Sequence, residues 1–448
     1  MSTRILDRVM AGVDDVPRLP STAATSPQYD QVARELHTEL IESLDLAQVR
    51  TRPRLELEPR LRASLAETIA GRSLPITAAE RARVVDDVID EVLGLGPLEQ
   101  LLRDDANTDI LVNGRDTVYV ERNGRLFRTD VRFRDDQHLI NVIERIVNAV
   151  GRRIDESTPM VDARLADGSR FNAIIPPLAL DGPVVSIRRF GVVPLAAADL
   201  VASGSIPGPI MELLSACVGA KLNVLISGGT GTGKTTLLNV LSSFVPGGER
   251  IITVEDAAEL KLQQPHVVRL ETRPPNLEGR GEVTMRDLVR NALRMRPDRI
   301  IVGEIRGSEA IDMLQAMNTG HEGSLGTIHA NSPRHALRRL ETLVGLGLGN
   351  IPGPSIREMI GDALDLVVQV HRMQDGVRRL VSVTEVAGME QGVTVTQELF
   401  QFHQTRVDKD GRVHGTFRAT GVRPDFAAKL EAHGHPLSPE ILMFEQEV

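Results

Sequence analysis

The chain has 448 residues, of which 41% are hydrophobic, and its formal net charge is −9. A chain of this length usually forms roughly two to four domains, and its apolar content is sufficient to fill their cores. The acidic total, with only two tyrosines and no tryptophan, argues against nucleic acid as a partner, because such binding needs basic charge and aromatic stacking surfaces.

The single cysteine, Cys217, excludes an internal disulfide and a cysteine-based zinc site, and this fits a reducing cytosol. The first residues carry charges where a signal peptide is apolar, and no apolar run approaches about 18 residues. We therefore expect a cytoplasmic protein without a transmembrane segment, associated only peripherally with the inner face of the cell membrane.

The N-terminal part divides into a tail and a helical region. Residues 1–28 are rich in Ser, Thr, Pro and Asp without periodicity, which predicts a disordered tail. Residues 29–104 contain helical patterns of apolar residues, and one of them opens with Thr77 and Glu80 at capping-box spacing. We expect a helical bundle over 29–104.

Strand and hairpin signals follow in residues 105–200. The turn pairs Asn123-Gly124 and Asp167-Gly168 separate strand-like runs, and a helix is predicted between them, over about 136–150. This pattern predicts a mixed α/β domain. The stretch from about 192 to 209 is rich in Ala, Ser, Gly and Pro and is expected to be the linker to the next domain.

Residues 201–375 alternate short apolar strands with amphipathic helices. Such alternation predicts parallel strands joined by crossover helices. After residue 375 the chain becomes rich in β patterns with charged turns, so we expect residues 376–448 to form a C-terminal β-rich extension.

Lys234 is one of only five lysines among 52 basic residues, and it lies in a run that fills the pattern G-x-x-x-x-G-K-[ST]. The run follows an apolar strand and opens a helix, as a phosphate-binding loop requires. We expect its amides to bind the β- and γ-phosphates of ATP, with Lys234 adding a point charge and Thr235 a hydroxyl for Mg²⁺. The expected nucleotide-binding residues are Gly228, Gly229, Thr230, Gly231, Thr232, Gly233, Lys234, Thr235 and Thr236.

Two apolar strands end in acidic residues, one in Glu304 and the other in Glu255 and Asp256. The carboxyl ends of parallel strands meet at one edge of a sheet, so these carboxylates should lie beside the glycine loop. We expect Glu304 to orient the attacking water. Glu255 or Asp256 would hold Mg²⁺ through water or activate the nucleophile, and the sequence leaves open which does which; capping of a helix is the structural alternative for Asp256.

Histidines and arginines provide further candidates. His321 and His329 flank a short strand, and we interpret them as a sensor of the γ-phosphate rather than a metal site, because the acidic cluster suits Mg²⁺. Arg188 and Arg189 end a strand just before the linker, so closure of their domain would bring them to the phosphates. Surface ion pairs are the alternative for these arginines. The arginines at 269, 273 and 280 are placed where a neighbouring subunit's site would suit them.

The order of these motifs resembles that of the secretion ATPase superfamily: first the glycine loop, then the two acidic strands, then the histidine segment. Members of this superfamily drive type II and type IV secretion and pilus assembly. The segments 293–299, 303–307 and 316–324, together with 168–177 and 186–190 upstream, are most similar to the Tad (Flp) pilus assembly ATPase branch, the CpaF type. The type II secretion branch often carries a four-cysteine zinc insertion, for which this chain lacks the cysteines.

The resemblance implies a RecA-like P-loop NTPase core, preceded by a PAS-like mixed α/β domain and the helical bundle. It identifies the four elements as Walker A, Asp box, atypical Walker B and His box. It further implies a homo-hexameric ring with ATP between the two domains. Such a motor hydrolyses ATP to power assembly of a Tad/Flp type IV pilus, with retraction as a further task, through an inner-membrane platform protein.

Three alternatives stay open. A related traffic ATPase of a type IV secretion or conjugation machine is the second enzyme interpretation. A DNA-translocating motor is built on the same core, but the acidic charge and scarce aromatics disfavour it. A nucleotide-gated scaffold without turnover would have no need of a water-orienting acid such as Glu304.

Overall fold

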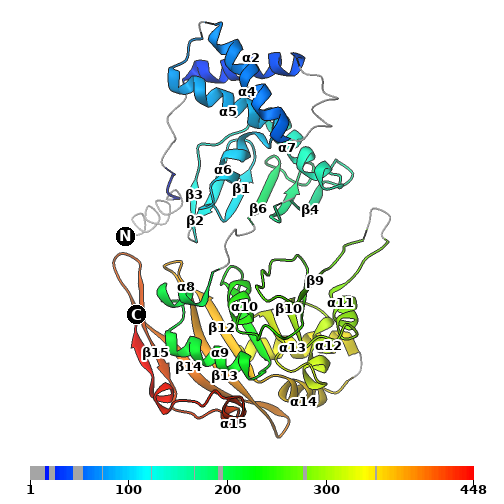
Figure 1. The fold of residues 1–448 in the computed structure, drawn as a ribbon, viewed down its shortest axis with the longest axis vertical. Coiled ribbons are helices and arrows are strands. Elements are labelled where there is room, and N and C mark those ends of the chain that lie inside the picture. The colour runs from blue at the N-terminus through cyan, green and yellow to red at the C-terminus, as the bar shows by residue number, and fades with distance from the viewer. Residues whose placement is uncertain are drawn as a thin grey trace, which may run out of the picture. The chain divides into compact units, whose positions relative to one another are not determined.

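The computed structural model describes residues 16–19, 26–43, 54–72, 74–122, 124–165, 167–189, 195–275, 280–348 and 351–448. The chain forms two units, Met1–Val192 and Val193–Val448, called unit 1 and unit 2 here (Figure 1). Most of the predicted disordered tail lies outside the described residues. Within it, Arg18 forms a parallel bridge with Arg128.

The helices of unit 1 follow from its apolar spacing. Helices α2 (Pro27–Ser43), α4 (Arg54–Ala70) and α5 (Ala78–Leu93) share one apolar core, and the Thr77–Glu80 capping box is present at the start of α5. Residues spaced three or four apart lie on the same face of a helix. The buried side chains of this core therefore include Val32, Leu36, Leu40, Leu61, Leu65, Ile69, Val84 and Val88.

The remainder of unit 1 is a six-stranded antiparallel sheet packed against a helix. Its strand order is β3-β2-β1-β6-β5-β4. Alternating residues such as Ile110 and Val112 are buried against α7 (Asp136–Ala149), which Asp135 caps. This is the predicted mixed α/β domain. The elements are η1 (Gly96–Leu98), α6 (Glu99–Arg103), β1 (Asp109–Asn113), β2 (Val118–Arg122), β3 (Arg125–Arg128), β4 (Met160–Arg164), β5 (Arg170–Ile174) and β6 (Val184–Arg188).

Unit 2 is built on a ten-stranded sheet with the order β16-β15-β14-β13-β12-β7-β11-β10-β8-β9. The strands from β12 to β9 in this order are parallel, and β13 to β16 add antiparallel strands at one side. The strands are β7 (Val224–Gly228), β8 (Ile251–Glu255), β9 (Val267–Glu271), β10 (Arg299–Ile305), β11 (Leu325–His329), β12 (Leu366–Arg372), β13 (Arg378–Glu390), β14 (Val393–Val407), β15 (Val413–Ala419) and β16 (Glu445–Glu447).

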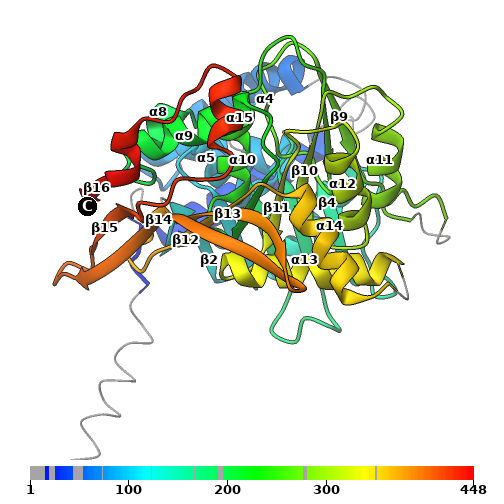
Figure 2. The same cartoon turned by 90° about the horizontal axis from the view of Figure 1, so that it is seen from below.

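Helices cover both faces of this sheet, which gives the RecA-like α/β core. One apolar core lies under α8 (Ala197–Ala202), α9 (Gly208–Gly219), α10 (Lys234–Ser242) and α15 (Ala427–Ala432). The other lies under α11 (Met285–Ala292), α12 (Glu309–Asn318), α13 (Pro333–Leu348) and α14 (Gly353–Ala363). Figure 2 shows α9 and α15 on one side of the sheet and α13 and α14 on the other.

Two segments are integrated more closely into unit 2 than their sequences indicate. Helix α8 forms within the predicted linker, because Leu200 packs into the core under α9. The β-rich run after residue 375 continues the sheet of the glycine loop through β13. The short helix η2 (Pro439–Met443) precedes β16 at the sheet edge.

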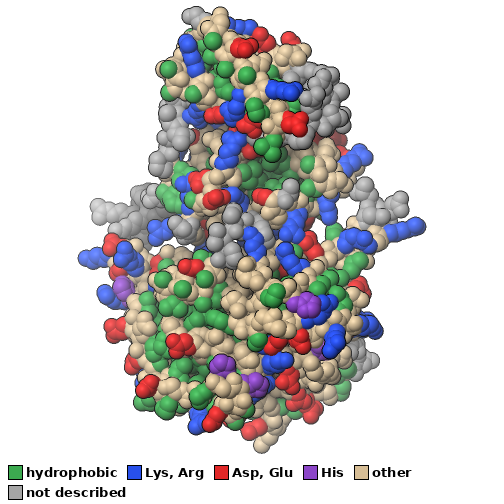
Figure 3. All heavy atoms as spheres, in the orientation of Figure 1, with side chains coloured by type: hydrophobic (Ala, Val, Ile, Leu, Met, Phe, Trp, Pro, Cys, Tyr) green, Lys and Arg blue, Asp and Glu red, His purple; other side chains and the backbone are tan. Residues whose placement is uncertain are grey.

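The surface of unit 2 is mixed in charge. Figure 3 shows basic, acidic and histidine side chains interspersed on the face drawn. None of the described helices combines the length and the apolarity that a membrane crossing requires.

Candidate nucleotide-binding site

The glycine loop joins β7 to α10, and its backbone requires glycine at several positions. Gly231 and Gly233 have φ values of 69° and 93°, a conformation that residues with a Cβ rarely adopt. A Cβ at Gly228 would lie 2.7 Å from the carbonyl oxygen of Val370 on β12. The loop therefore packs closely against β12 and leads directly into α10, and the amino end of a helix is a position where anions commonly bind.

Lys234 begins α10 and folds back over the loop. Its Nζ donates hydrogen bonds to the carbonyl oxygens of Gly228, at 3.0 Å, and Gly229, at 2.8 Å. Thr235 and Thr236 are half-buried in the first turn of the helix. The nine predicted residues thus form one continuous loop and helix start, with the lysine charge centred over it.

The strand register brings the acidic strands to the same edge. His329 at the end of β11 pairs with Gly228, Ile305 pairs with Ile328, and Val302 pairs with Val254 of β8. The carboxyl ends of β7, β11, β10 and β8 therefore lie side by side, as parallel strands joined by crossover helices dictate.

Glu304 lies in a β-bulge of β10. Val302 pairs with Gly326 and Ile305 with Ile328, so two residues of β10 face only Thr327. The Thr327 hydroxyl donates a 2.6 Å hydrogen bond to the Gly303 carbonyl oxygen. Bulges redirect side chains and are common beside active sites. The bulge therefore sets the direction of Glu304, which a regular strand would have placed differently.

Arg306 connects two of the predicted acids. Its Nη2 donates to Glu304 at 2.7 Å, and its Nη1 donates to Asp256 at 3.2 Å. Burial alone would raise the pKa of Glu304, but the hydrogen bond and charge of Arg306, together with Lys234 and His329, hold that pKa below its ordinary value. Glu304 is therefore kept as a carboxylate at neutral pH.

Glu255 and Asp256 have different environments although they are adjacent. Glu255 is 2% exposed, and its Oε2 accepts hydrogen bonds from the amides of Glu259 and Leu260, while its Oε1 has no hydrogen-bond partner in the described ranges. Burial raises the pKa of Glu255 despite those bonds and the charge of Arg269. Asp256 is partly exposed and faces Arg306. Glu255 therefore anchors the chain after β8, and Asp256 is the more accessible carboxylate.

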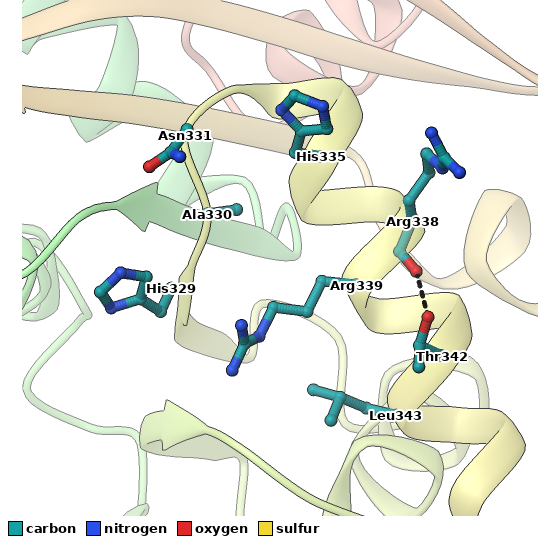
Figure 4. Close-up of a pocket in the computed structure, with 8 residues that line it drawn as sticks. All are labelled: His329, Ala330, Asn331, His335, Arg338, Arg339, Thr342 and Leu343. Carbon is teal, nitrogen blue, oxygen red and sulfur yellow. Dashed lines mark hydrogen bonds between the residues drawn. The ribbon is translucent and has the colours of Figure 1, made fainter.

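His329 borders a surface hollow between the end of β11 and α13. The hollow measures about 530 Å³, and Figure 4 shows Arg339 reaching from α13 toward the segment that carries His329. The charge of His329 also contributes to lowering the pKa of Glu304. His329 therefore belongs to the same edge as the glycine loop. The hollow is lined by His329, Ala330, Asn331, His335, Arg338, Arg339, Thr342 and Leu343.

His321 lies at the opposite edge of the sheet. It precedes β11, whose amino end starts at Leu325, whereas His329 ends that strand. The Ser324 hydroxyl donates to the His321 carbonyl, and the His321 amide donates to Ala316. An extended strand of this length separates the two histidines, and a part for His321 in sensing the γ-phosphate stays a prediction.

Arg188 and Arg189 lie in unit 1 and bond to acidic residues there. Arg188 donates to Asp109 at 3.1 Å, and Arg189 donates to Asp105 at 2.9 Å. Arg189 also donates to the carbonyl oxygen of Asp104, and its side chain is mostly buried. These contacts match the ion-pair alternative for both arginines, and any part in catalysis stays a prediction.

The fold also brings in arginines that the motifs did not single out. Arg378 on β13 donates to the carbonyl oxygen of Gly231 at 3.0 Å. A Cβ at Gly231 would lie 3.7 Å from the guanidinium of Arg372. No local pattern relates residues so far apart in the sequence. For Arg306, its position two residues after Glu304 is the available signal, because residues two apart along a strand lie on the same face.

Comparisons with known proteins agree with this geometry. The family model described as type II/IV secretion system protein matches residues 91–417. A Mycobacterium tuberculosis protein named for conjugal transfer is 42% identical over 314 residues, covering 68% of this chain and 89% of that protein. The conjugal transfer protein TrbB of Rhizobium radiobacter is 33% identical over 276 residues, covering 61% of this chain and 80% of that protein.

Solved structures also resemble the chain. The VirB11 ATPase from the Brucella suis type IV secretion system is 30% identical, covers 64% of this chain and 91% of its own, and has a TM-score of 0.36. The family match spans most of the chain and includes the glycine loop, both acidic strands and His329. The protein therefore belongs to the type II/IV secretion system protein family.

Proposed function

We propose that the protein is an ATPase that powers a secretion or pilus machine. The observation that carries this proposal is the convergence of the glycine loop, Glu304 and His329 on one edge of the parallel sheet. The loop amides and Lys234 bind the β- and γ-phosphates. Glu304, held as a carboxylate by Arg306, accepts a hydrogen bond from the attacking water.

In the proposed reaction the water oxygen bonds to the γ-phosphorus while the bond to the β–γ bridging oxygen breaks. ADP leaves, and the proton of the water ends on the inorganic phosphate. Such transfers are catalysed mainly by positioning and charge stabilisation. Lys234 stabilises charge on the phosphates, and Glu304 fixes the direction of attack.

The site fits Mg²⁺ held largely by the nucleotide. Within the described ranges, no group of three or more His, Cys, Asp or Glu side chains is suited to hold a metal ion by itself. Mg²⁺ in phosphate sites is usually held by phosphate oxygens, water and one or two protein groups. Thr235 and the accessible Asp256 would supply those groups, and the ion would neutralise phosphate charge.

The type of machine is a narrower proposal. The motifs around Glu304 and His321 are most similar to Tad/Flp pilus assembly ATPases, which favours a hexameric pilus motor working on an inner-membrane platform protein. The relatives named for conjugal transfer favour a type IV secretion or conjugation motor. Deleting the gene and measuring both surface filaments and transfer frequency distinguishes them, since each proposal predicts the loss of only one.

Phosphate release by the purified protein with ATP and Mg²⁺ tests the ATPase proposal. Lys234→Ala should lower the rate by about a hundredfold or more, because the phosphate charge loses its partner. Lys409→Ala, in the exposed turn between β14 and β15, is the matched control and should leave the rate unchanged. A wild-type rate no higher than that of Lys234→Ala would contradict the proposal.

The ring is tested separately by light scattering with and without nucleotide. A hexamer is expected when nucleotide is bound. A monomer at every concentration would exclude the ring, although it would leave the hydrolytic site as proposed.

A further inference from the structure

Gln369 is a buried polar residue in the middle of the sheet that carries the glycine loop. It lies on β12 and is only 1% exposed. Its register partners are Ser227, directly before Gly228 on β7, and Ser382 on β13. Two residues earlier, the corresponding positions on β7 and β12 are Leu225 and Val367 of the apolar core. A polar row at this depth needs hydrogen bonds to offset its loss of water.

Two members of this row, Gln369 and Ser227, donate hydrogen bonds to the carbonyl oxygen of Ala330. The Gln369 Nε2 donates to that oxygen at 3.2 Å, and the Ser227 hydroxyl donates to it at 3.4 Å. Ala330 follows β11 directly, and the last register pair of β11 is His329 with Gly228. Gln369 and Ser227 therefore hold the chain where it leaves the sheet.

The held segment carries His329. Figure 4 shows His329 and Ala330 consecutive at the end of the strand, with Arg339 reaching from α13 toward this segment. The residue before His329 pairs with Ile305, which directly follows Glu304, so His329 and Glu304 lie on neighbouring strands at the same edge of the sheet. A displacement of the Ala330 carbonyl would therefore move His329 relative to Glu304.

Maximal stability does not account for a glutamine at this position. Among the residues that the structure describes, neither the Oε1 atom of Gln369 nor the hydroxyl of Ser382 has a hydrogen-bond partner, and both atoms are buried. Leaving a buried polar atom unbonded is unfavourable, and an apolar side chain of similar shape would avoid that penalty. The bond to Ala330 is the one hydrogen bond that the Gln369 side chain makes among the described residues.

We propose that Gln369 is a positioning residue that holds the Ala330 carbonyl, and through it His329, beside Glu304 during ATP hydrolysis. The inference rests on the proposed ATPase function and extends it to a residue outside the four sequence motifs. In the part of the chain that the structure describes, the Gln369 side chain makes no hydrogen bond to the nucleotide loop or to the acids. Its effect is therefore on the rate of the chemical step rather than on nucleotide binding.

Gln369→Leu and Gln369→Met remove the donor while keeping a side chain of similar size. We expect kcat to fall about tenfold, since a small displacement of a reacting group is sufficient for such a loss. The Kd for a fluorescent ADP analogue should stay within twofold of the wild-type value, and the melting temperature should not fall below that of the wild type. Ser382→Ala is the control from the same row, and its kcat should equal that of the wild type.

Gln369→Glu should show a pH dependence of kcat that would not arise if Gln369 served only in packing. The carboxylate cannot donate to Ala330, whereas the protonated acid can. Its kcat relative to wild type should therefore rise as the pH is lowered from 8 to 6. The same ratio for Gln369→Leu should stay constant, and equal pH dependence of the two variants would overturn the inference.

A double-mutant cycle tests whether Gln369 acts through His329. The variant carrying both Gln369→Leu and His329→Ala should be no slower than His329→Ala alone, because the second change removes the group being positioned. If the loss of kcat in the double variant equalled the product of the two single losses, the inference would be overturned. If the wild type itself releases no phosphate, the ATPase proposal fails; if the wild type is active and Gln369→Leu is equally active, only the role of Gln369 fails.

Discussion

Strand β10 has an arginine at each end, and the two have opposite environments. Arg299, at the amino edge of the sheet, is 0% exposed and bonds to Glu249 and to the carbonyl oxygens of Val218 and Gly323. Arg306, just beyond the carboxyl edge, has a half-exposed side chain shared between Glu304 and Asp256.

The amino edge is therefore a fixed framework, and the carboxyl edge has ion pairs that can exchange. Asn223 strengthens the framework by accepting from the amides of Gly323 and Ser324 and donating to Ala363. Solvated ion pairs are weak, whereas a buried charge without its partner is strongly unfavourable. Changes at the two edges should accordingly separate loss of chemistry from loss of stability.

The largest effect is expected from Glu304→Gln at the carboxyl edge. The amide keeps the shape but cannot act as the carboxylate that directs water, so phosphate release should fall about a hundredfold or more while ATP still binds. Glu322→Gln is the matched change at the amino edge, where the exposed carboxylate lies 3.7 Å from Lys429. It should leave the rate unchanged, and normal turnover in Glu304→Gln would contradict the assignment of the water-orienting acid.

A large effect on stability is expected at the other end of β10. Arg299→Met leaves Glu249 without its buried partner, so the free energy of unfolding should fall by about 3 kcal/mol or more. Arg306→Met breaks solvated ion pairs and should change the free energy of unfolding by less than about 1 kcal/mol. Urea unfolding of both variants measures the difference, and equal losses would show that the two edges do not differ as described.

The two histidines near opposite ends of β11 should differ by a smaller effect on kcat. His329→Ala should lower kcat about tenfold, as expected for loss of a positioned charged or hydrogen-bonding group near the reacting atoms. His321→Ala, at the framework edge, should change kcat less than twofold. Steady-state phosphate release at saturating ATP tests both, and a greater loss for His321 would show that it reaches a site in a neighbouring subunit.

The smallest effect at neutral pH is expected from Arg306→Met, which should change kcat mainly on the acid side of its pH profile. Arg306 holds the pKa of Glu304 below its ordinary value against the effect of burial, so the carboxylate survives as the pH falls. Arg306→Met should raise that pKa, and the rate should then decline at a higher pH than in the wild type. Profiles of kcat, each normalised to its own plateau, measure the shift; a decline at the same or a lower pH would contradict the coupling.

The elements that meet at the site can be predicted from the order of residues in the chain. The glycine loop is a contiguous motif, and its neighbours in the chain make it a strand, turn and helix start. The acidic strand ends were assigned to its edge because parallel strands with crossover helices share one carboxyl edge. Both inferences depend on local spacing and one topological rule, so a single sequence is sufficient for them.

The directions and partners of the side chains at the site depend on contacts that form only in the tertiary structure. The bulge that directs Glu304 depends on pairing between β10 and β11, and the separation of His321 from His329 depends on which end of β11 each one occupies. The contacts of Gln369 with Ala330 and of Arg378 with Gly231 join residues far apart in the chain. Such contacts arise from packing between strands that are not consecutive, and no periodicity within either segment specifies them.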